Sequence, residues 1–202
     1  MDETTRSPRR APRSGERKQD AERSRRLLLE AAKEEFAAKG FAGARVQDIA
    51  DRAGVNKQLI NYYFGGKEGL YCELGRRWLE WESEISDPGI PLGELWERYL
   101  AEAMADGRGL RLAAWRGLTE ELDAIPDDDS EDLADLTRRK ADGELAEDLE
   151  VEAVMAMMNA MVVLPVVMPN AIRRIYGMDP RSPEFYERYA AQMRRIIAHL
   201  AP

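Results

Sequence analysis

Residues 46–64 read VQDIADRAGVNKQLINYYF, and this stretch decides the fold. Its apolar residues fall into two short runs at helical spacing, separated by Gly54. Ala50 and Ala53 are small enough for two helices to approach closely, and Val55 can fill the angle between them. Because glycine enters the left-handed backbone region at no steric cost, Gly54 permits a tight turn at this point. The stretch therefore predicts a helix-turn-helix.

Helical periodicity continues on both sides of this motif. Upstream, apolar residues recur every four positions and predict a helix that begins near Asp20 and stops at Gly40. These apolar residues are Leu28, Ala32 and Phe36. The first short helix of the motif is expected to start near Arg45, and the second to cover residues 56–64. Two glycines close the second helix, and a longer helix is predicted over residues 67–86.

The remainder of the chain is also predicted to be helical. Five further helices are expected, with prolines between them, over residues 92–105, 110–124, 129–142, 144–164 and 183–200. No run of alternating apolar and polar residues with β-branched enrichment supports a sheet. The predicted fold class is therefore all-α. Its expected segments are a disordered basic arm over residues 1–19, a helix-turn-helix domain over residues 20–66 and a larger helical domain over residues 67–202.

The composition fits one or two compact soluble domains, because 44% of the 202 residues are apolar and 34% are charged. A collagen, a mucin and a disulfide scaffold are excluded. The single cysteine, Cys72, cannot form an internal disulfide, and the first residues are charged rather than apolar, so a reducing cytoplasm is expected. The most apolar stretch, residues 153–169, is shorter than the about 20 residues of a spanning helix and contains Pro165, so no membrane span is expected.

Charge is distributed unevenly along the chain. Residues 1–70 contain 15 Lys and Arg against 11 Asp and Glu, whereas residues 71–202 contain 15 against 27. A basic front joined to an acidic body suggests that the front contacts a polyanion that the body would repel, although chance drift in charge is an alternative. The arm over residues 1–19 is either a simple tail or a flexible cationic segment that raises affinity for phosphate.

The second helix of the motif is expected to expose a polar face opposite its apolar one. The exposed residues are Asn56, Lys57, Gln58, Asn61 and Tyr62, and the apolar ones are Val55, Leu59 and Ile60. Amide side chains can bond adenine, lysine can reach guanine acceptors or phosphate, and tyrosine hydroxyls can bond phosphate oxygens. These residues suit a helix that reads a DNA groove, and taken alone they suit an ordinary solvated helix equally well.

The segments around the motif resemble the tetracycline-repressor-like (TetR) family of transcriptional regulators. The resemblance rests on RLLL at 26–29 with Phe36 and Gly40-Phe41, VQDIA at 46–50 with AGV at 53–55, and NYYF at 61–64 followed by KEGLY at 67–71. It implies an N-terminal three-helix DNA-binding domain with the helix-turn-helix, and a C-terminal helical ligand-binding and dimerisation domain. Two positions depart from the family pattern: Arg45 stands where a small hydroxylated helix cap is usual, and Glu35 stands where an apolar residue is frequent.

The resemblance also implies which residues contact DNA. Base-facing positions correspond to Asn56, Lys57 and Gln58, and phosphate-contacting positions to Tyr62, Tyr63 and Lys67. Backbone amides at a helix N-terminus also attract phosphate, which further supports a phosphate contact at Lys67. The full predicted set is Arg45, Val46, Asn56, Lys57, Gln58, Asn61, Tyr62, Tyr63 and Lys67.

A homodimer is expected, because one helix-turn-helix reads only a few base pairs and half-sites lie about one helical turn apart. The partner would then be a pseudo-palindromic double-stranded DNA operator. The resemblance implies a four-helix bundle of the last two long helices, whose apolar faces exceed what one small domain needs to cover. The residues named for this interface are Met157, Met161, Leu164, Phe185, Tyr189, Met193, Ile196 and Ile197, and part of this set is expected to be plain core.

Family members usually couple DNA release to a small molecule bound in the larger domain, and repression is their commoner behaviour. Candidate ligand-lining residues are Trp96, Tyr99, Met104, Trp115, Met155, Met158 and Asn159. Because methionines are deformable and candidates for buried charge are few, an apolar or aromatic effector is expected. Alternatively, each of these residues is an ordinary part of the hydrophobic core. The helix over residues 67–86 is expected to act as the mechanical link that shifts the recognition helices.

Two other classes of protein are alternatives to a transcriptional regulator. An enzyme has little support, because His199 is the only histidine, Cys72 has no base partner, and no Gly-rich phosphate loop or metal-ligand spacing occurs. We therefore expect no catalytic residues, no metal and no cofactor. A sequence-neutral or ligand-independent DNA-binding protein is the second alternative, and the acidic body argues against it because a packaging protein would be basic throughout.

Overall fold

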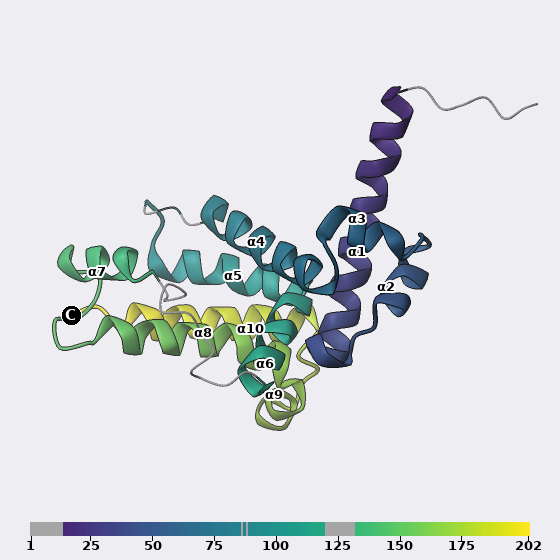
Figure 1. The fold of residues 1–202 in the computed structure, drawn as a ribbon. Coiled ribbons are helices and arrows are strands. Elements are labelled where there is room, and N and C mark those ends of the chain that lie inside the picture. Colours follow the sequence, from purple (N-terminus) through teal and green to yellow (C-terminus); the bar gives the residue numbers. More distant parts are fainter. Residues whose placement is uncertain (1–13, 86, 88, 120–131) are drawn as a thin grey trace, which may run out of the picture.

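The computed structural model describes residues 14–85, 87, 89–119 and 132–202 of the chain. Within these ranges the regular structure is helical throughout, which confirms the predicted all-α class. The helices form two groups, each around its own core. The first group comprises α1 (Ser14–Gly43), α2 (Val46–Ala53) and α3 (Gln58–Phe64), and the N-terminal part of α1 projects beyond it (Figure 1).

The first helix departs from the expectation at both ends. It begins at Ser14, inside the segment expected to be a disordered arm, while residues 1–13 lie outside the described part of the chain. Gly40 interrupts the helix as predicted, since its φ of 69° lies in the left-handed region, and one further turn follows to Gly43. The core of this first group is built from Leu28, Ala32, Phe36, Ile49, Ala50 and Ile60, all fully buried.

The predicted helix-turn-helix is present as α2, a turn and α3. Gly54 ends α2 at φ 65°, and its N–H donates to the carbonyl oxygens of Ala50 and Asp51. Helix α3 starts at Gln58, two residues later than predicted, because the side chain of Asn56 accepts a hydrogen bond from the Gln58 backbone N–H (2.9 Å). Gly65 then ends α3 at φ 73°. Glycine therefore closes both short helices, and the turn angle between them is fixed.

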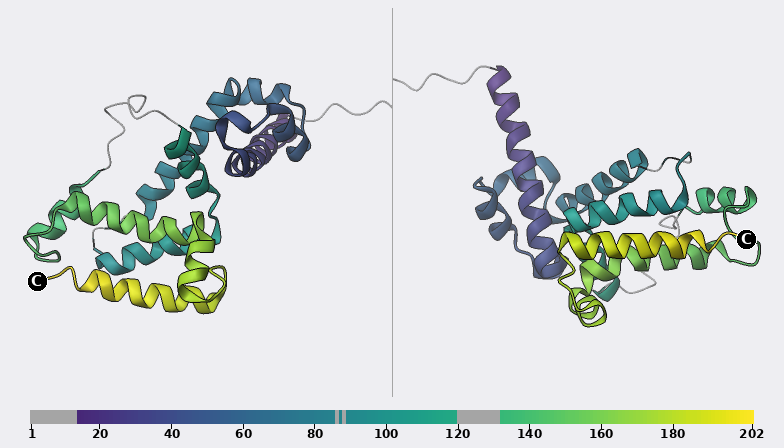
Figure 2. Two further views of the ribbon diagram at one scale, coloured as in Figure 1. Left: turned by 90° about the horizontal axis from the view of Figure 1, so that it is seen from below. Right: turned by 180° about the vertical axis from the view of Figure 1, so that it is seen from behind.

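The second group contains the remaining helices. These are α4 (Lys67–Ile85), α5 (Leu92–Ala105), α6 (Arg108–Thr119), α7 (Ala134–Ala141), α8 (Val151–Val167), α9 (Pro169–Tyr176) and α10 (Pro183–Ala198). Helix α5 packs against both α8 and α10, and Figure 2 shows α8 and α10 extending along the same long direction of this group. Their shared core includes Trp96, Leu100, Phe185 and Tyr189.

Several predicted boundaries in this group are wrong. Helix α8 begins at Val151 rather than near residue 144, because residues 144–150 form turns, with Leu145 buried and the Ala146 N–H donating to the Leu200 carbonyl oxygen (2.7 Å). Helix α9 was not predicted: Pro169 was taken only as a break, whereas it occupies the first turn of α9, where a missing N–H costs nothing. The predicted ends of the helices over 110–124 and 129–142 fall in residues 120–131, outside the described part of the chain.

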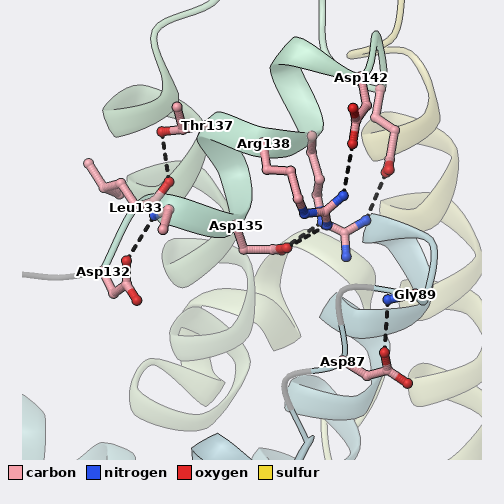
Figure 3. Close-up of polar contacts among 11 residues, drawn as sticks. Asp87, Gly89, Asp132, Leu133, Asp135, Thr137, Arg138 and Asp142 are labelled. Atoms are coloured by element: carbon pink, nitrogen blue, oxygen red, sulfur yellow. Dashed lines mark hydrogen bonds and ion pairs between the residues drawn. The ribbon is translucent and has the colours of Figure 1, made fainter.

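Helix α7 is held by ion pairs of its own residues. Arg138 lies between Asp135 (2.6 Å) and Asp142 (2.9 Å), as Figure 3 shows. The neighbouring Arg139 is fully buried, and its guanidinium donates to Asp135 (2.6 Å) and to Glu144 (2.8 Å) in the turn that leads to α8. These arginines hold the pKa of the Asp135 carboxyl below its usual range despite the opposing effect of burial. Helix α7 is therefore tied to the turn that leads to α8.

Helix α8 continues past Pro165, which was expected to end it. A proline inside a helix has no N–H for the carbonyl four residues earlier, which is that of Met161. The hydroxyl of Tyr189 in α10 donates to this carbonyl oxygen instead (2.7 Å). Burial raises the pKa of Tyr189 to about 12, so the hydroxyl keeps its proton. The tyrosine thus satisfies the acceptor that the proline leaves open and ties α10 to α8.

Replacing this tyrosine tests the interpretation. Tyr189→Phe is expected to lower the free energy of unfolding by about 1–2 kcal/mol, because a buried carbonyl oxygen loses its donor. Tyr176→Phe is the matched control: its ring packs on Phe185 and Tyr189, and no hydrogen bond of its hydroxyl is found within the described residues. Urea denaturation followed by circular dichroism measures both variants. Equal losses of stability would show that the Tyr189 hydroxyl has no special role.

Among the described residues, no single helix is long and apolar enough to cross a membrane. Helices α8 and α9 together pass the same test of length and composition, but they are bent by 94° at their junction. Most of the apolar residues of α8 contribute to the core with α5 and α10, among them Val154, Met158 and Val162.

Candidate nucleic-acid interface

Helix α3 presents a polar face to solvent. The exposed residues of this face are Asn56, Lys57, Gln58, Asn61 and Tyr62, and Tyr62 is 79% exposed. On the opposite side Ile60 is fully buried, with Val55 and Leu59 half-buried around it. Tyr63 is half-buried and meets Tyr62 edge-on, with 5.0 Å between the ring centroids. The structure therefore places Gln58, Asn61 and Tyr62 on the exposed side of α3, with Asn56 and Lys57 exposed in the turn before it, whereas Tyr63 packs against the core and Lys67 lies in α4.

Two of the predicted contact residues also have structural roles. The side-chain oxygen of Asn56 caps α3, so its amide group alone is free to donate to a base. Val46 is half-buried and packs against the N-terminal core, so it supports the interface from beneath. Arg45 precedes α2 with extended backbone and no side-chain capping bond, as expected for an arginine at a cap position. Its exposed guanidinium is available to phosphate.

Lys67 stands at the first position of α4. Its ammonium lies 4.5 Å from the centre of the Phe41 ring and 3.5 Å from the carbonyl oxygen of Ala42. It therefore connects the start of α4 to the end of α1, close to the α3–α4 turn. A lysine held beside a helix N-terminus is well placed for phosphate, which is the role predicted for it.

Glu35 departs from the family pattern and has a definite place in the structure. Its carboxylate is 1% exposed and forms ion pairs with Lys39, one turn along α1, and with Arg52 of α2 (3.5 Å). Lys39 also contacts Asp48 (3.1 Å). The hydrogen bonds to Glu35 and Asp48 raise the pKa of Lys39, and the Lys39 ammonium lowers the pKa of Asp48. The departure from the family pattern at Glu35 is thus part of an ion-pair cluster that joins α1 to α2.

A second ion-pair cluster joins α1 to α4. Glu73 of α4 accepts hydrogen bonds from Arg76 and from Arg25 of α1, each 2.8 Å long. These arginines lower the pKa of Glu73 to about 2, so it is ionised throughout the physiological range. Arg25 also lies over the Phe64 ring at the end of α3, 5.4 Å from its centre. This cluster holds α3 and α4 in a fixed relation to α1.

Helix α6 connects the first group of helices, α1 to α3, to the larger domain. Leu112 packs against the N-terminal core, while Leu110 packs against the core of the larger domain. The ring of Trp115 covers the bend at Gly40, where an added Cβ would lie 3.1 Å from it. At the start of this helix Arg108 contacts Glu30 of α1 (3.1 Å). The sequence predicted α4 as the link between domains; the α1–α6 contact is an additional link.

The predicted effector residues are scattered. Trp96 and Met158 are buried in the core of the larger domain, and Tyr99, Met104 and Met155 pack partly buried against that core. Trp115 lies instead against α1, and Asn159 is exposed on α8. The indole N–H of Trp96 is buried and has no hydrogen-bond partner among the described residues. It is a donor that an acceptor on a bound molecule would satisfy.

The predicted dimer residues also divide into two sets. Phe185, Tyr189 and Ile197 are buried in the protomer's own core, which removes them from an open surface because their atoms already contact α5 and α8. Ile196 is exposed, and Met157, Met161, Leu164 and Met193 are half-buried at the edge of the core. Sequence reasoning missed three exposed alanines of α8, at positions 153, 156 and 160, whose helical spacing was the available signal.

This fold and its exposed α3 face define a helix-turn-helix protein of the DNA-binding class. Residues 28–74 match the family described as bacterial regulatory proteins, tetR family, so this part of the chain is similar to the DNA-binding segment of that family. The match covers the second half of α1 through the first half of α4, which includes the whole helix-turn-helix.

Curated relatives share the same part of the chain. The transcriptional repressor NicS of Pseudomonas putida is 33% identical over 99 residues, which cover 43% of this chain and 47% of NicS. The transcriptional repressor SCO4008 of Streptomyces coelicolor is 38% identical over 101 residues, which cover 49% of this chain and 52% of that protein. The chain thus matches about half the length of these relatives. Both are repressors rather than enzymes, in agreement with the prediction that this chain is not an enzyme.

Solved structures extend the likeness to the larger domain. SCO4942 of Streptomyces coelicolor, a proposed transcriptional regulator, superposes with a TM-score of 0.71 at 27% identity, covering 89% of this chain and 98% of that one. The ketosteroid transcriptional regulator KstR2 of Mycobacterium tuberculosis superposes with a TM-score of 0.62 at 21% identity, covering 87% and 93%. The second likeness concerns the fold alone. The arrangement of a helix-turn-helix domain on a larger helical domain is therefore shared along most of the chain.

Proposed function

We propose that this protein is a homodimeric transcriptional repressor that binds a pseudo-palindromic DNA operator and is released by a small effector. The observation that carries the proposal is the polar face of α3, with exposed Lys57, Gln58 and Tyr62 opposite the fully buried Ile60. A helix anchored in this way can enter the major groove with its amide and amine groups toward the base edges. Operator binding would take place in the cytoplasm, where we expect the protein.

A second copy would be needed to read a two-fold operator. In support, α8 exposes a small apolar face made of Ala153, Ala156 and Ala160, and half-buried Met157 and Leu164 flank it. Small residues allow two helices to approach closely, and α10 carries a further exposed apolar side chain, Ile196. We propose that this face, rather than Phe185, Tyr189 and Ile197, contacts the partner subunit.

A charge placed on this face is expected to weaken the dimer. Ala156→Asp would bury a carboxylate without a partner in each subunit, at a cost of about 2 kcal/mol or more in dimerisation free energy. Sedimentation velocity over a range of protein concentrations measures the shift toward monomer. Ala101→Asp, the same change at an exposed position of α5, is the control and is expected to leave the mass unchanged. An unchanged monomer–dimer equilibrium in Ala156→Asp would exclude this face.

The effector is proposed to act by shifting the position of α3 relative to its copy in the partner subunit. Helix α4 is one route, since Glu73 is tied to Arg25 of α1 and Trp78 packs on Gly109 of α6. The contact of Trp115 with Gly40 is a second route. An apolar or aromatic body could rest against Trp96, whose unpartnered indole N–H would orient an acceptor atom.

The first experiment is selection of bound duplexes from a random DNA pool by the purified protein. The affinity of the selected duplex is then measured at two salt concentrations. A pseudo-palindrome with a large ratio of specific to non-specific affinity is the expected result. Binding that only fades with salt, with no enriched motif, would replace this proposal by the sequence-neutral DNA-binding protein.

A further inference from the structure

A groove lies at the end of the larger domain that faces α1. It encloses a volume of about 770 Å³ between the α5–α6 turn, the end of α8, the start of α9 and the loop that leads to α10. Figure 1 shows α6 and α9 close to the end of α1, so the groove borders the contact between the two groups of helices. A volume of this size is sufficient for a small organic molecule.

The charged residues of this groove are mostly arginines. Its lining contains Arg108, Arg111, Arg173 and Arg181 against Asp106 and Asp179. The lining is therefore cationic, whereas the chain as a whole carries a net charge of −8. A cationic cavity in an acidic protein favours an anionic occupant, because the local potential rather than the net charge decides which ion enters.

The arginines differ in how far their own chain neutralises them. Arg108 donates to Asp106 at 2.7 Å, and Arg181 reaches Asp179 only through longer contacts of 3.3 and 3.4 Å. No hydrogen bond or ion pair of the Arg111 or Arg173 side chain is found within the described ranges, although the charge of Arg173 acts on Asp179. Two guanidinium groups at the groove thus have donors to spare, and a guanidinium binds carboxylate or phosphate in bidentate fashion.

Two helices also begin at this groove. Arg108 is the first residue of α6, and Pro169 and Asn170 open α9. Helix N-termini carry partial positive charge, so both add to the attraction for an anion. The Arg108 N–H already donates to Asp106 (3.2 Å) and Pro169 has no N–H, so the contribution is mainly that of the helix dipoles. The rest of the lining is apolar and includes Met104, Pro165 and Val166. The groove therefore combines a cationic rim with a surface that suits an apolar body.

We propose that this groove binds a small carboxylate with an apolar or aromatic body, and that Arg108 communicates its presence to α1. The carboxylate would be held by Arg111 and Arg173, with the body against Met104 and Val166. The binding step stands on the groove alone, and its effect on the operator rests on the proposed function. This site is separate from the buried core around Trp96.

The route to α1 consists of ion pairs that share residues with the groove. Arg108 contacts Glu30 (3.1 Å) and Glu34 (3.6 Å) of α1, and Asp106 contacts Lys33 of α1 (2.6 Å). Arg108 lines the same groove as Arg111 and Arg173, so a carboxylate held by those two arginines also attracts the Arg108 guanidinium, in opposition to Glu30, Glu34 and Asp106. Carboxylate binding therefore weakens the hold of α6 on the helix that carries α2 and α3.

The binding test uses the full chain and four probes in isothermal titration calorimetry. Octanoate and 1-naphthoate are the aliphatic and aromatic carboxylates, and octanamide and 1-naphthamide are their uncharged counterparts. At least one carboxylate is expected to bind in the micromolar to millimolar range, with its amide at least about tenfold weaker. The double variant Arg111→Gln/Arg173→Gln is expected to lose about tenfold or more in carboxylate affinity. The control Arg174→Gln/Arg195→Gln removes the same charge outside the groove and is expected to bind normally.

Each alternative result of this titration overturns the groove site. Three results would each contradict the site. In the first, neither carboxylate binds in the millimolar range. In the second, acid and amide bind equally, and in the third, the two double variants have equal carboxylate affinity. The protein would still bind its selected operator in these cases, so a failure of the groove is distinct from a failure of the proposed function.

The coupling is tested on the operator found by selection. The carboxylate that binds is expected to lower operator affinity of the unaltered protein. Glu30→Gln/Glu34→Gln is expected to reduce that response while carboxylate affinity is retained or raised, because the variant lacks the two competing glutamates. Both glutamates lie on α1 and outside the groove lining. An undiminished response in this variant would show that Arg108 does not transmit the signal.

Discussion

Gly69→Ala is expected to destabilise the DNA-binding domain and to abolish tight operator binding. A Cβ at position 69, in the first turn of α4, would lie 1.7 Å from the carbonyl oxygen of Phe64 at the end of α3. The obstacle is backbone, so no side-chain rotation relieves it, and the α3–α4 turn must open. Overpacking of this kind costs about 1–3 kcal/mol or more, and it displaces the helix that presents the polar face. Thermal denaturation and operator titration measure the two effects.

Gly75→Ala is the matched control for this prediction. Gly75 lies in the same helix, and an added Cβ there would meet nothing within 4 Å. Since alanine favours helix over glycine by about 1 kcal/mol, this variant is expected to be as stable as the unaltered protein or more so. Equal behaviour of the two variants would show that the close approach of α4 to Phe64 is not needed for the fold.

The double variant Lys57→Ala/Gln58→Ala is expected to lose operator binding without losing stability. Both side chains are exposed at the start of α3, and no hydrogen bond of either side chain is found among the described residues. Each base contact contributes about 1–3 kcal/mol to discrimination between the right and the wrong base. A dimer would lose this contribution in both half-sites. We therefore expect about a hundredfold loss or more in specific affinity, a smaller loss on random DNA and an unchanged melting temperature.

Two further variants serve as comparisons for this prediction. Tyr62→Phe removes a hydroxyl expected to contact phosphate, so it should weaken binding to operator and to random DNA by a similar, smaller factor. Gln192→Ala, an exposed change on α10, should alter neither affinity. If Lys57→Ala/Gln58→Ala retained its preference for the operator, α3 would not be the element that reads the sequence.

The N-terminal domain could be predicted closely because its determinants are local. The turn needs Gly54, the helix ends need Gly40 and Gly65, and the apolar spacing around them shows which face is buried. The polar face of α3 follows from the same spacing, so its residues can be identified from the sequence. The start of α3 was misplaced by two residues because the cap by Asn56 depends on a side-chain hydrogen bond, which apolar periodicity does not show.

The larger domain was predicted less well because its details depend on contacts between distant residues. Pro165 indicates the end of a helix when it is considered alone, yet α8 continues because Tyr189, far along the chain, supplies a donor to Met161. The alanines of α8 are small and gave no strong hydrophobic signal, although they occupy its exposed face. Phe185 was assigned to a partner surface because the pattern shows that a residue is apolar but not which neighbour covers it.

The sequence by itself thus determined the all-α class, the helix-turn-helix and the side chains that it exposes, since each follows from spacing within one or two helical turns. Tertiary structure decided the rest. It placed Glu35 between two cations, joined α6 to α1 through Arg108 and Glu30, and gathered arginines from α6, α9 and the following loop around one groove. The physical reason is that burial and charge pairing depend on neighbours across the fold, and periodicity along one helix does not specify those neighbours.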